Sequence, residues 1–287
     1  MENTFIKKQS QPQQQNINTQ GSPQMAPQHQ LKIKDPNKLT PEQEVEIKKS
    51  VVHALVQESH AGWEYTLMLV LSVLITTLGL IEGSASVVIG GMLLAPLMTP
   101  ILALGLSLIT GNRDSSFRSG LNILKSIGII LVASTATAFV FGAEYDLFNN
   151  FEILDRTDPT LLFMYIAVLS GVGAAYTWAK PHLSARLPGI AVAVALVPPL
   201  CVTGVGISLL SREIILGSFQ LFIVNLLGIA GSSAIVFAAL GFYQMKYVEK
   251  QEIKVEKAID EQKKLEEEKK KQEEAMLTQV NTSPTTN

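Results

Sequence analysis

Six long apolar stretches, separated by short polar segments, occupy the middle of the chain. A membrane-spanning helix needs about 20 consecutive and mostly apolar residues, and a soluble protein rarely contains so many runs of that length. The stretches predict six transmembrane helices, at about 63–81, 85–110, 120–142, 160–178, 187–210 and 214–244. We therefore expect an all-α, polytopic integral membrane protein whose transmembrane domain covers residues 61–245.

The two ends of the chain have a different composition from the middle. Residues 1–39 are rich in glutamine and predict a disordered tail. An amphipathic helix is expected over 40–60, because Thr40, Pro41 and Gln43 form a helix-start signature. This helix either lies along the membrane interface or binds a partner. Residues 246–277 predict a charged helix, either solvated or in a coiled coil, and 278–287 predict a second disordered tail.

Prolines interrupt two of the apolar stretches. Pro96 and Pro100 fall in the second expected helix, and Pro198 and Pro199 fall in the fifth. Proline lacks the backbone N–H and clashes with the preceding helical turn. We therefore expect both helices to be broken, either as simple kinks or as parts of a binding site. Paired interruptions in corresponding helices are typical of transporters.

Three expected helices precede an acidic loop, at about 144–158, and three follow it. Pro96-Leu97 is repeated as Pro199-Leu200, and Gly128-Ile129 is repeated as Gly228-Ile229. Because three is an odd number, the second half would run in the opposite direction through the membrane. The pattern predicts two inverted three-helix repeats, flanked by cytoplasmic helices.

The basic residues near the spans predict the orientation. Four lie in loops on the same side as both termini (Arg113, Arg118, Lys180 and Arg186), and two lie on the other side (Arg156 and Arg212). Loops rich in Lys and Arg stay in the cytoplasm, so we expect both termini to be cytoplasmic. The net charge of −2 adds little to this picture.

The run from Gly90 to Leu102, G-G-M-L-L-A-P-L-M-T-P-I-L, resembles the signature G-A-M-L-x-x-P-L-M-x-P-I of the family called domain of unknown function 389. The stretch 193–200, A-V-A-L-V-P-P-L, and Asn225-Leu226 are similar to the second half of that family. Gly91 replaces an alanine and Thr99 replaces a glycine, and both replacements are small. The resemblance covers about 60–245. It implies a multi-pass protein of a prokaryotic cell membrane, with no assigned activity.

Candidate residues for a solute path lie beside the interruptions, where freed carbonyls and hydroxyls could replace a solute's hydration shell. They are Pro96, Thr99, Pro100, Pro198, Pro199, Thr203 and Asn225. For a hydroxyl the simpler interpretation is a hydrogen bond to its own helix, and for Asn225 it is an interhelical bond. Candidates for a gate or hinge are Glu82, Gly90, Gly91, Gly204 and Gly206. Glu82 otherwise reads as an acid that faces water.

Other function classes lack their sequence signatures. There is no phosphate-binding loop of an ATP-driven pump, no zinc-protease motif and no paired carboxylates within a span. We expect no enzyme activity, metal, cofactor or nucleic-acid partner. The leading hypothesis is a channel or secondary transporter for a small solute or ion, embedded in the lipid bilayer as a homodimer. The alternative is a non-transporting scaffold or sensor that acts through its cytoplasmic helices.

Overall fold

The computed structural model describes residues 41–58, 62–180 and 187–255, and single positions up to 269; the side chains of Pro41, Glu58 and residues 187–195 are not included. Every regular element in this part of the chain is a helix, which confirms the expected all-helical class. The two predicted tails, 1–39 and 278–287, lie outside the described residues, as does much of the predicted charged helix beyond residue 255.

Four helices are long and apolar enough to cross a membrane: α2 (Trp63–Glu82), α5 (Arg113–Phe141), α7 (Leu161–Ala179) and α9 (Arg212–Ala239). In α2, large apolar side chains such as Leu71, Leu74 and Leu78 point outward, whereas Ser72 and Thr76 are fully buried. A helix that exposes leucine and buries hydroxyls suits a lipid surround and a packed interior. These helices indicate a membrane protein.

The remaining elements are shorter or are interrupted. They are α1 (Pro41–Glu58), α3 (Ala85–Met92), α4 (Met98–Thr110), η1 (Gly142–Glu144), α6 (Phe151–Leu154), α8 (Leu187–Ser208) and η2 (Phe242–Met245). Helical structure resumes after η2 and continues through residues 246–255, which we call the C-terminal segment.

The expected break in the fifth apolar stretch is wrong, because α8 runs as one helix through Pro198 and Pro199. Two consecutive prolines remove two amide donors, but they do not force the chain to leave the helix if its neighbours hold it in place. α8 packs against α5 and α9, and residues 196–206 are buried. Tertiary packing therefore keeps the helix continuous here.

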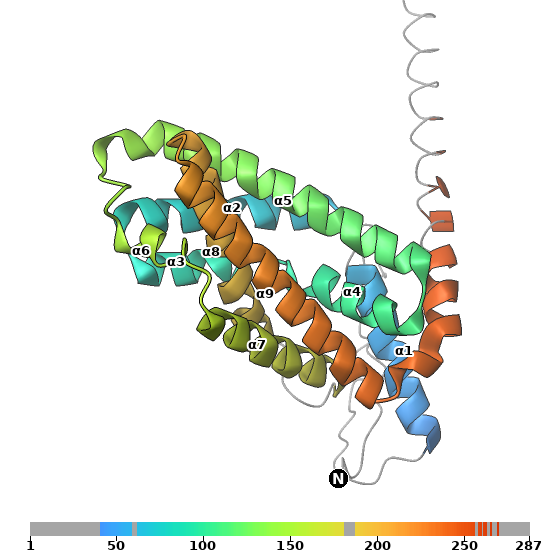
Figure 1. Cartoon of the computed structure of the whole chain (residues 1–287). Helices are drawn as coiled ribbons and strands as arrows, with labels where there is room; N and C mark the ends of the chain where they lie inside the picture. The colour runs from blue at the N-terminus through green and yellow to red at the C-terminus, as the bar shows by residue number, and fades with distance from the viewer. Residues whose placement is uncertain are drawn as a thin grey trace, which may run out of the picture. The chain divides into compact units, whose positions relative to one another are not determined.

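The core helices pack in a pattern that joins distant parts of the sequence. α7 lies along α9, α5 lies along α8, and α4 packs against α9 (Figure 1). α2 and α3 form a hairpin whose turn contains Gly83 in the left-handed conformation. The side-chain amide of Asn150 donates to the carbonyl oxygens of Leu80 and Ile81, at 2.9 and 3.3 Å, and so holds this turn. We call this end of the bundle the hairpin end.

The opposite end of the bundle, the α1 end, carries α1 and the C-terminal segment (Figure 1). The apolar face of α1 is buried within the protein: Val52 and Leu55 are fully covered and belong to the main core. This face packs on α4, α7 and η2, so it is not left for the membrane interface. Ile253 of the C-terminal segment is also buried in the core. This segment is therefore docked and not fully solvated.

The turns that precede α5 and α9 have the same backbone geometry. Gly111 before α5 has a φ of 63°, and Leu210 before α9 has a φ of 53°. The next amide in each turn reaches back five residues: Asn112 N–H bonds the Ser107 carbonyl at 3.3 Å, and Ser211 N–H bonds that of Gly206 at 3.0 Å. This left-handed helix end normally takes glycine.

Substitutions at these two turns should change stability in opposite directions. A non-glycine residue in the left-handed conformation is strained by roughly 1–2 kcal/mol. Gly111→Leu should lower the stability by about that amount. The nearest atom to a Cβ at Gly111 is the flexible Lys246 Nζ, at 3.8 Å, so packing adds little. Leu210→Gly should relieve the same strain, but the greater freedom of glycine in the unfolded chain offsets part of that gain. The stability should therefore rise by less than the full strain energy. Thermal unfolding in detergent measures the stability of both variants. A Leu210→Gly protein that is less stable than the parent would contradict the predicted strain at Leu210.

Candidate functional site

The second apolar stretch is interrupted between α3 and α4. The last backbone hydrogen bonds of α3 join Leu94 N–H to the Gly91 carbonyl and Ala95 N–H to the Met92 carbonyl, both at 3.2 Å. These bonds span three residues and not four, which is how a helix tightens before it ends. Pro96 follows in the turn and has no N–H with which to continue the series. The expected break is therefore present, and we call residues 93–97 the interruption.

Near the start of α4, one backbone carbonyl lacks the N–H donor that a continuous helix would give it. Thr99 and Pro100 are buried in the first turn of α4. Pro100 has no N–H, so the carbonyl four residues earlier, that of Pro96, has no α-helical donor. Pro96 itself is half-buried, whereas Leu93 and Leu94 are exposed. The interruption thus carries a polar backbone group between the core and the outer surface.

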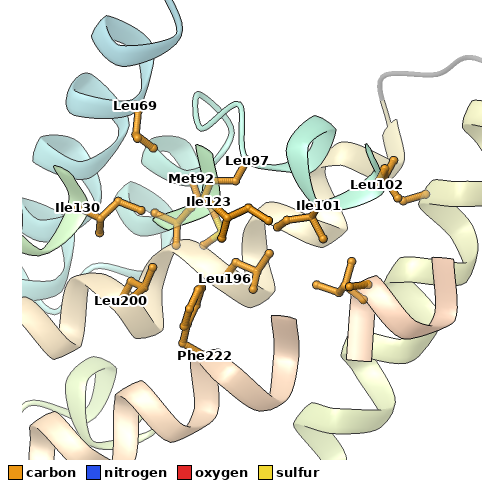
Figure 2. Packing of buried hydrophobic residues seen from close by; sticks show 14 of the residues in the cluster. Leu69, Met92, Leu97, Ile101, Leu102, Ile123, Ile130, Leu196, Leu200 and Phe222 are labelled. Atoms are coloured by element: carbon orange, nitrogen blue, oxygen red, sulfur yellow. The ribbon is translucent and has the colours of Figure 1, made fainter. Parts of the chain in front are cut away.

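The interruption is seated on the apolar core. Met92 and Leu97, on either side of it, lie in the same buried cluster as Leu196 and Leu200 of α8. Figure 2 shows these side chains gathered together, with Phe222 of α9 below Leu196. The interruption and the start of the proline region of α8 therefore meet in the same part of the core, which is closed by packed side chains in this structure.

Hydroxyl groups of α2 lie beside the interruption, and they are not among the residues predicted from the sequence. Ser72 and Thr76 are fully buried, and their hydroxyls have no hydrogen-bond partner among the described residues. Thr76 touches the last turn of α3, since a Cβ built on Gly91 would lie 2.5 Å from Thr76 Oγ1. The next residue, Thr77, faces Cys201 of α8. The four-residue spacing of Ser72 and Thr76 was the available signal, because it puts both on one face of an apolar helix.

The candidates on α8 and α9 are buried and are bonded within the bundle. Thr203 Oγ1 donates to the carbonyl of Pro199 at 2.9 Å and lies 2.8 Å from Ser218 Oγ of α9. This is the simpler of the two interpretations of Thr203, a bond within its own helix and to a neighbour. Asn225 is 1% exposed and therefore faces the bundle and not lipid. Pro198 and Pro199 are buried in the continuous helix.

The four glycines proposed as hinges differ in how closely they are packed. Gly90 is exposed, and a Cβ there would meet nothing within 4 Å. Gly91 lies against Thr76, and a Cβ on Gly206 would lie 2.8 Å from Ile214 Cγ2 of α9. Gly204 lies against Ser134 of α5. In this structure, Gly91, Gly204 and Gly206 therefore allow close helix contacts, which is the usual use of small residues in membrane helices.

Two glycine–serine contacts are arranged reciprocally across the core. Gly204 of α8 lies against Ser134 of α5, and Gly105 of α4 lies against Ser233 of α9. Both serine hydroxyls are buried and donate to carbonyls of their own helices, Ser134 to Ile130 at 2.6 Å and Ser233 to Ala230 at 2.9 Å. Each serine thereby presents a small and satisfied surface to the glycine of its partner helix.

Glu82 lies at the hairpin end, apart from the interruption. It is exposed, and its carboxylate accepts a hydrogen bond from the Tyr145 hydroxyl at 3.0 Å. That hydrogen bond raises the pKa of Tyr145, since it holds the phenolic proton. Glu82, Glu144 and Tyr145 line a pocket of about 490 Å³ whose other walls are apolar. The pocket opens where α2 and α5 end.

The chemistry available in the core is that of neutral oxygen atoms. Within the spans that the structure describes, the buried polar side chains are hydroxyls and the amide of Asn225. The described residues include no group of three or more His, Cys, Asp or Glu side chains that could hold a metal. Such a core can coordinate a solute through carbonyls, hydroxyls and an amide.

Comparison with known proteins agrees with the resemblance seen in the sequence. Residues 92–230 match the model of a family described as Domain of unknown function (DUF389). An uncharacterized protein of Methanocaldococcus jannaschii, MJ0678, is 25% identical over 191 residues, which cover 67% of this chain and 58% of the relative. The chain therefore spans less than two-thirds of the length of that curated relative. No solved structure matches. From residue 92 to residue 230, which includes the end of α3, the interruption and most of α9, this chain matches the DUF389 family model.

Proposed function

We propose that the protein is a channel or secondary transporter for a small solute or ion. The observation that carries this proposal is the interruption at residues 93–97, beside two buried α2 hydroxyls that have no hydrogen-bond partner among the described residues. A buried hydroxyl without a partner costs free energy, roughly 1–3 kcal/mol. A passing solute would supply the missing bonds at Ser72 and Thr76.

The neutral character of the core supports a path that is lined by backbone and hydroxyl groups. Ionisable side chains within a membrane are the usual elements of proton relays, and the described spans bury none. Carbonyl and hydroxyl oxygens coordinate a dehydrated ion or a polar solute without fixed charge. In this proposal the pocket at the hairpin end is the entrance, and the carboxylates of Glu82 and Glu144 attract cations to it.

We also propose that the six predicted spans form two inverted three-helix repeats. The turn into α5 reads Asn112-Arg113-Asp114 and the turn into α9 reads Ser211-Arg212-Glu213, which are polar-basic-acidic in both cases. The preceding residues, Gly111 and Leu210, share the left-handed conformation. In each of these pairs, the residue of the second half follows its counterpart in the first half by the same number of positions. The corresponding residues of the two glycine–serine contacts, Gly105 with Gly204 and Ser134 with Ser233, keep that same separation. Such a common register is what a duplicated unit would produce.

The directions of α5 and α9 support the inversion of the second repeat. α5 begins at the α1 end, where Gly111 lies near Lys246. α9 begins at the hairpin end, where Gly217 lies against Thr157. The equivalent helices are therefore antiparallel. The basic residues Arg113 and Lys180 adjoin the α1 end, which supports a cytoplasmic position for that end and for both termini.

A flux screen tests the proposed function directly. The purified full-length protein is reconstituted into liposomes and offered monovalent cations, divalent cations, inorganic anions and small neutral solutes in turn. At least one solute should cross faster than in empty liposomes, and Thr76→Val should reduce its flux, because valine matches threonine in shape but lacks the hydroxyl. Absence of flux for every class, from a protein that remains folded, would contradict the proposal.

The alternative function, a non-transporting scaffold or sensor, has one observation in its favour. α1 and the C-terminal segment pack together on the α1 end of the core, so a change in either could be passed to the other. In that case deleting the chain from residue 246 onward would abolish function in cells, and Thr76→Val would leave it intact. Comparing these two variants separates the alternatives.

A further inference from the structure

A fully buried glutamate fixes the C-terminal segment to the core. Glu249 has no exposed surface, although it lies in a part of the chain rich in lysine and glutamate. Its Oε2 accepts a hydrogen bond from the Thr110 hydroxyl, at the end of α4. Ser115, in the first turn of α5, provides a second hydrogen-bonding hydroxyl beside the carboxyl group. The side chain therefore inserts into the turn between α4 and α5.

Burial determines the protonation of this carboxyl group. Loss of water raises the pKa of Glu249, and the hydrogen bonds from Ser115 and Thr110 oppose this effect only in part. The other carboxyl oxygen, Oε1, is buried and accepts no hydrogen bond from the described residues. A protonated carboxyl tolerates such a site far better than a carboxylate does.

The elements that pack around Glu249 differ in the charged side chains that they carry. α4 and η2 carry no charged side chain. Asp114 of α5 and Lys250 and Lys254 of the C-terminal segment line a small cavity of about 20 Å³ beside Asn112. The remaining charged or titratable side chains that the structure describes in these elements and in neighbouring α1 are Arg113, Arg118 and Lys125 of α5, Tyr243 of η2, Lys246, Tyr247 and Glu252 of the C-terminal segment, and Glu42, Glu44, Glu46, Lys48, Lys49 and His53 of α1. Burial, and not one of these charges, is the main cause of the shift.

A second contact joins the C-terminal segment to α1. His53 Nδ1 of α1 lies 2.7 Å from Glu252 Oε2. This contact and the buried Glu249 hold the same docked arrangement.

We propose that the C-terminal segment is a proton-sensitive latch that closes on the α4–α5 turn and α1 in acid and is released as the pH rises. The docked state holds the Glu249 proton more tightly than the released state does. Docking is therefore strongest below the ordinary pKa of a glutamate and weakens as the pH rises through the raised pKa. This latch does not depend on whether the chain transports a solute.

The latch acts on only one of the two similar turns. The turn before α9 carries Leu209 in the place that Thr110 has before α5, and leucine has no hydroxyl to offer a carboxyl group. Leu210 in that turn is 88% exposed. If the core changes conformation and the α4–α5 turn moves, the latch would therefore restrain that movement only at the α1 end of the bundle.

Spin-label distances test the latch in the intact protein. Labels are placed at Lys49→Cys of α1 and Gln251→Cys of the C-terminal segment, both exposed, in a Cys201→Ala background in nanodiscs. We expect one narrow distance at pH 5 and a growing broad population at pH 9. The docking equilibrium should fall about ten-fold for each pH unit between the released and docked pKa values of Glu249.

Glu249→Gln imitates the protonated side chain and should stay docked at both pH values. Glu249→Lys should release the segment at every pH. Glu261→Gln, an exposed acid further along the chain, is the matched control and should behave like the parent. A parent whose distances do not change with pH would overturn the latch. So would a Glu249→Gln variant whose distances still change with pH.

Discussion

Pro96→Ala should reduce solute flux at least ten-fold while leaving the protein folded. Proline disfavours the helix interior by roughly 3 kcal/mol, and alanine is the best helix former. Alanine would also supply an N–H at position 96, four residues after Met92. The change therefore favours a continuous helix from α3 into α4, which would close the interruption and withdraw its carbonyls from a solute. A bias of about 3 kcal/mol is enough to shift a two-state population by roughly a hundred-fold.

Variants of two other prolines test whether the loss of flux is specific to Pro96. Pro159→Ala changes a proline in the loop before α7, outside the interruption, and should leave the flux unchanged. Pro199→Ala lies in a helix that is already continuous, so its effect on flux should be smaller than that of Pro96→Ala. Flux into proteoliposomes is measured with the solute found in the screen, and thermal unfolding reports on folding. Normal flux through Pro96→Ala would show that the interruption has no part in transport.

Gly204→Ala should destabilise the protein, and Ser134→Gly should rescue much of the loss. A Cβ on Gly204 would collide with Ser134 Oγ, and it would lie 2.8 Å from Ser134 Cβ and 3.1 Å from Thr135 N. Overpacking of a closely packed core costs about 1–3 kcal/mol. Ser134→Gly removes the two nearest atoms, so the double variant should be more stable than the two single changes predict. We expect a coupling free energy of about 1 kcal/mol or more.

The reciprocal contact provides a test with a different expected outcome. A Cβ on Gly105 would meet Ser233 Oγ, and Ser233→Gly would still leave two backbone atoms beside it, the Ala230 carbonyl oxygen at 3.1 Å and Ala234 N at 3.3 Å, so the rescue of Gly105→Ala should be only partial. Gly128→Ala, where a Cβ meets nothing within 4 Å, is the control and should be neutral or stabilising. Unfolding in a denaturing detergent series measures all of these variants. Additive effects at 204 and 134 would contradict the packing argument.

The sequence predicted one proline interruption correctly and the other incorrectly, for a physical reason. Pro96 and Pro198-Pro199 look alike in the sequence, because each removes amide donors from an apolar helix. Whether the chain leaves the helix depends on its neighbours, and α8 is enclosed by α5 and α9 through the proline region. Such enclosure is a property of the tertiary structure and is not visible in a local sequence pattern.

Local sequence patterns also could not predict two polar features of the structure. Ser72 and Thr76 look like ordinary hydroxyl residues of a membrane helix, and only the packing of α2 on α3 shows that they are buried beside the interruption. Glu249 is one of many acids in a charged segment, and its burial follows from the docking of that segment on Thr110. By contrast, the all-helical class and the family resemblance needed only apolar run lengths and a motif, and both are confirmed.

The packing of α4 on α9 has a consequence for how the protein is made. α4 has 13 residues, too few to cross a bilayer alone, and its partner α9 follows it by about a hundred residues of synthesis. The α2–α3 hairpin joins neighbours and can form early, whereas α4 packs first on α5 and meets its other main partner only when α9 enters the membrane. Nascent chains that end before residue 212 would therefore expose α4 to the insertion machinery and to quality-control proteases.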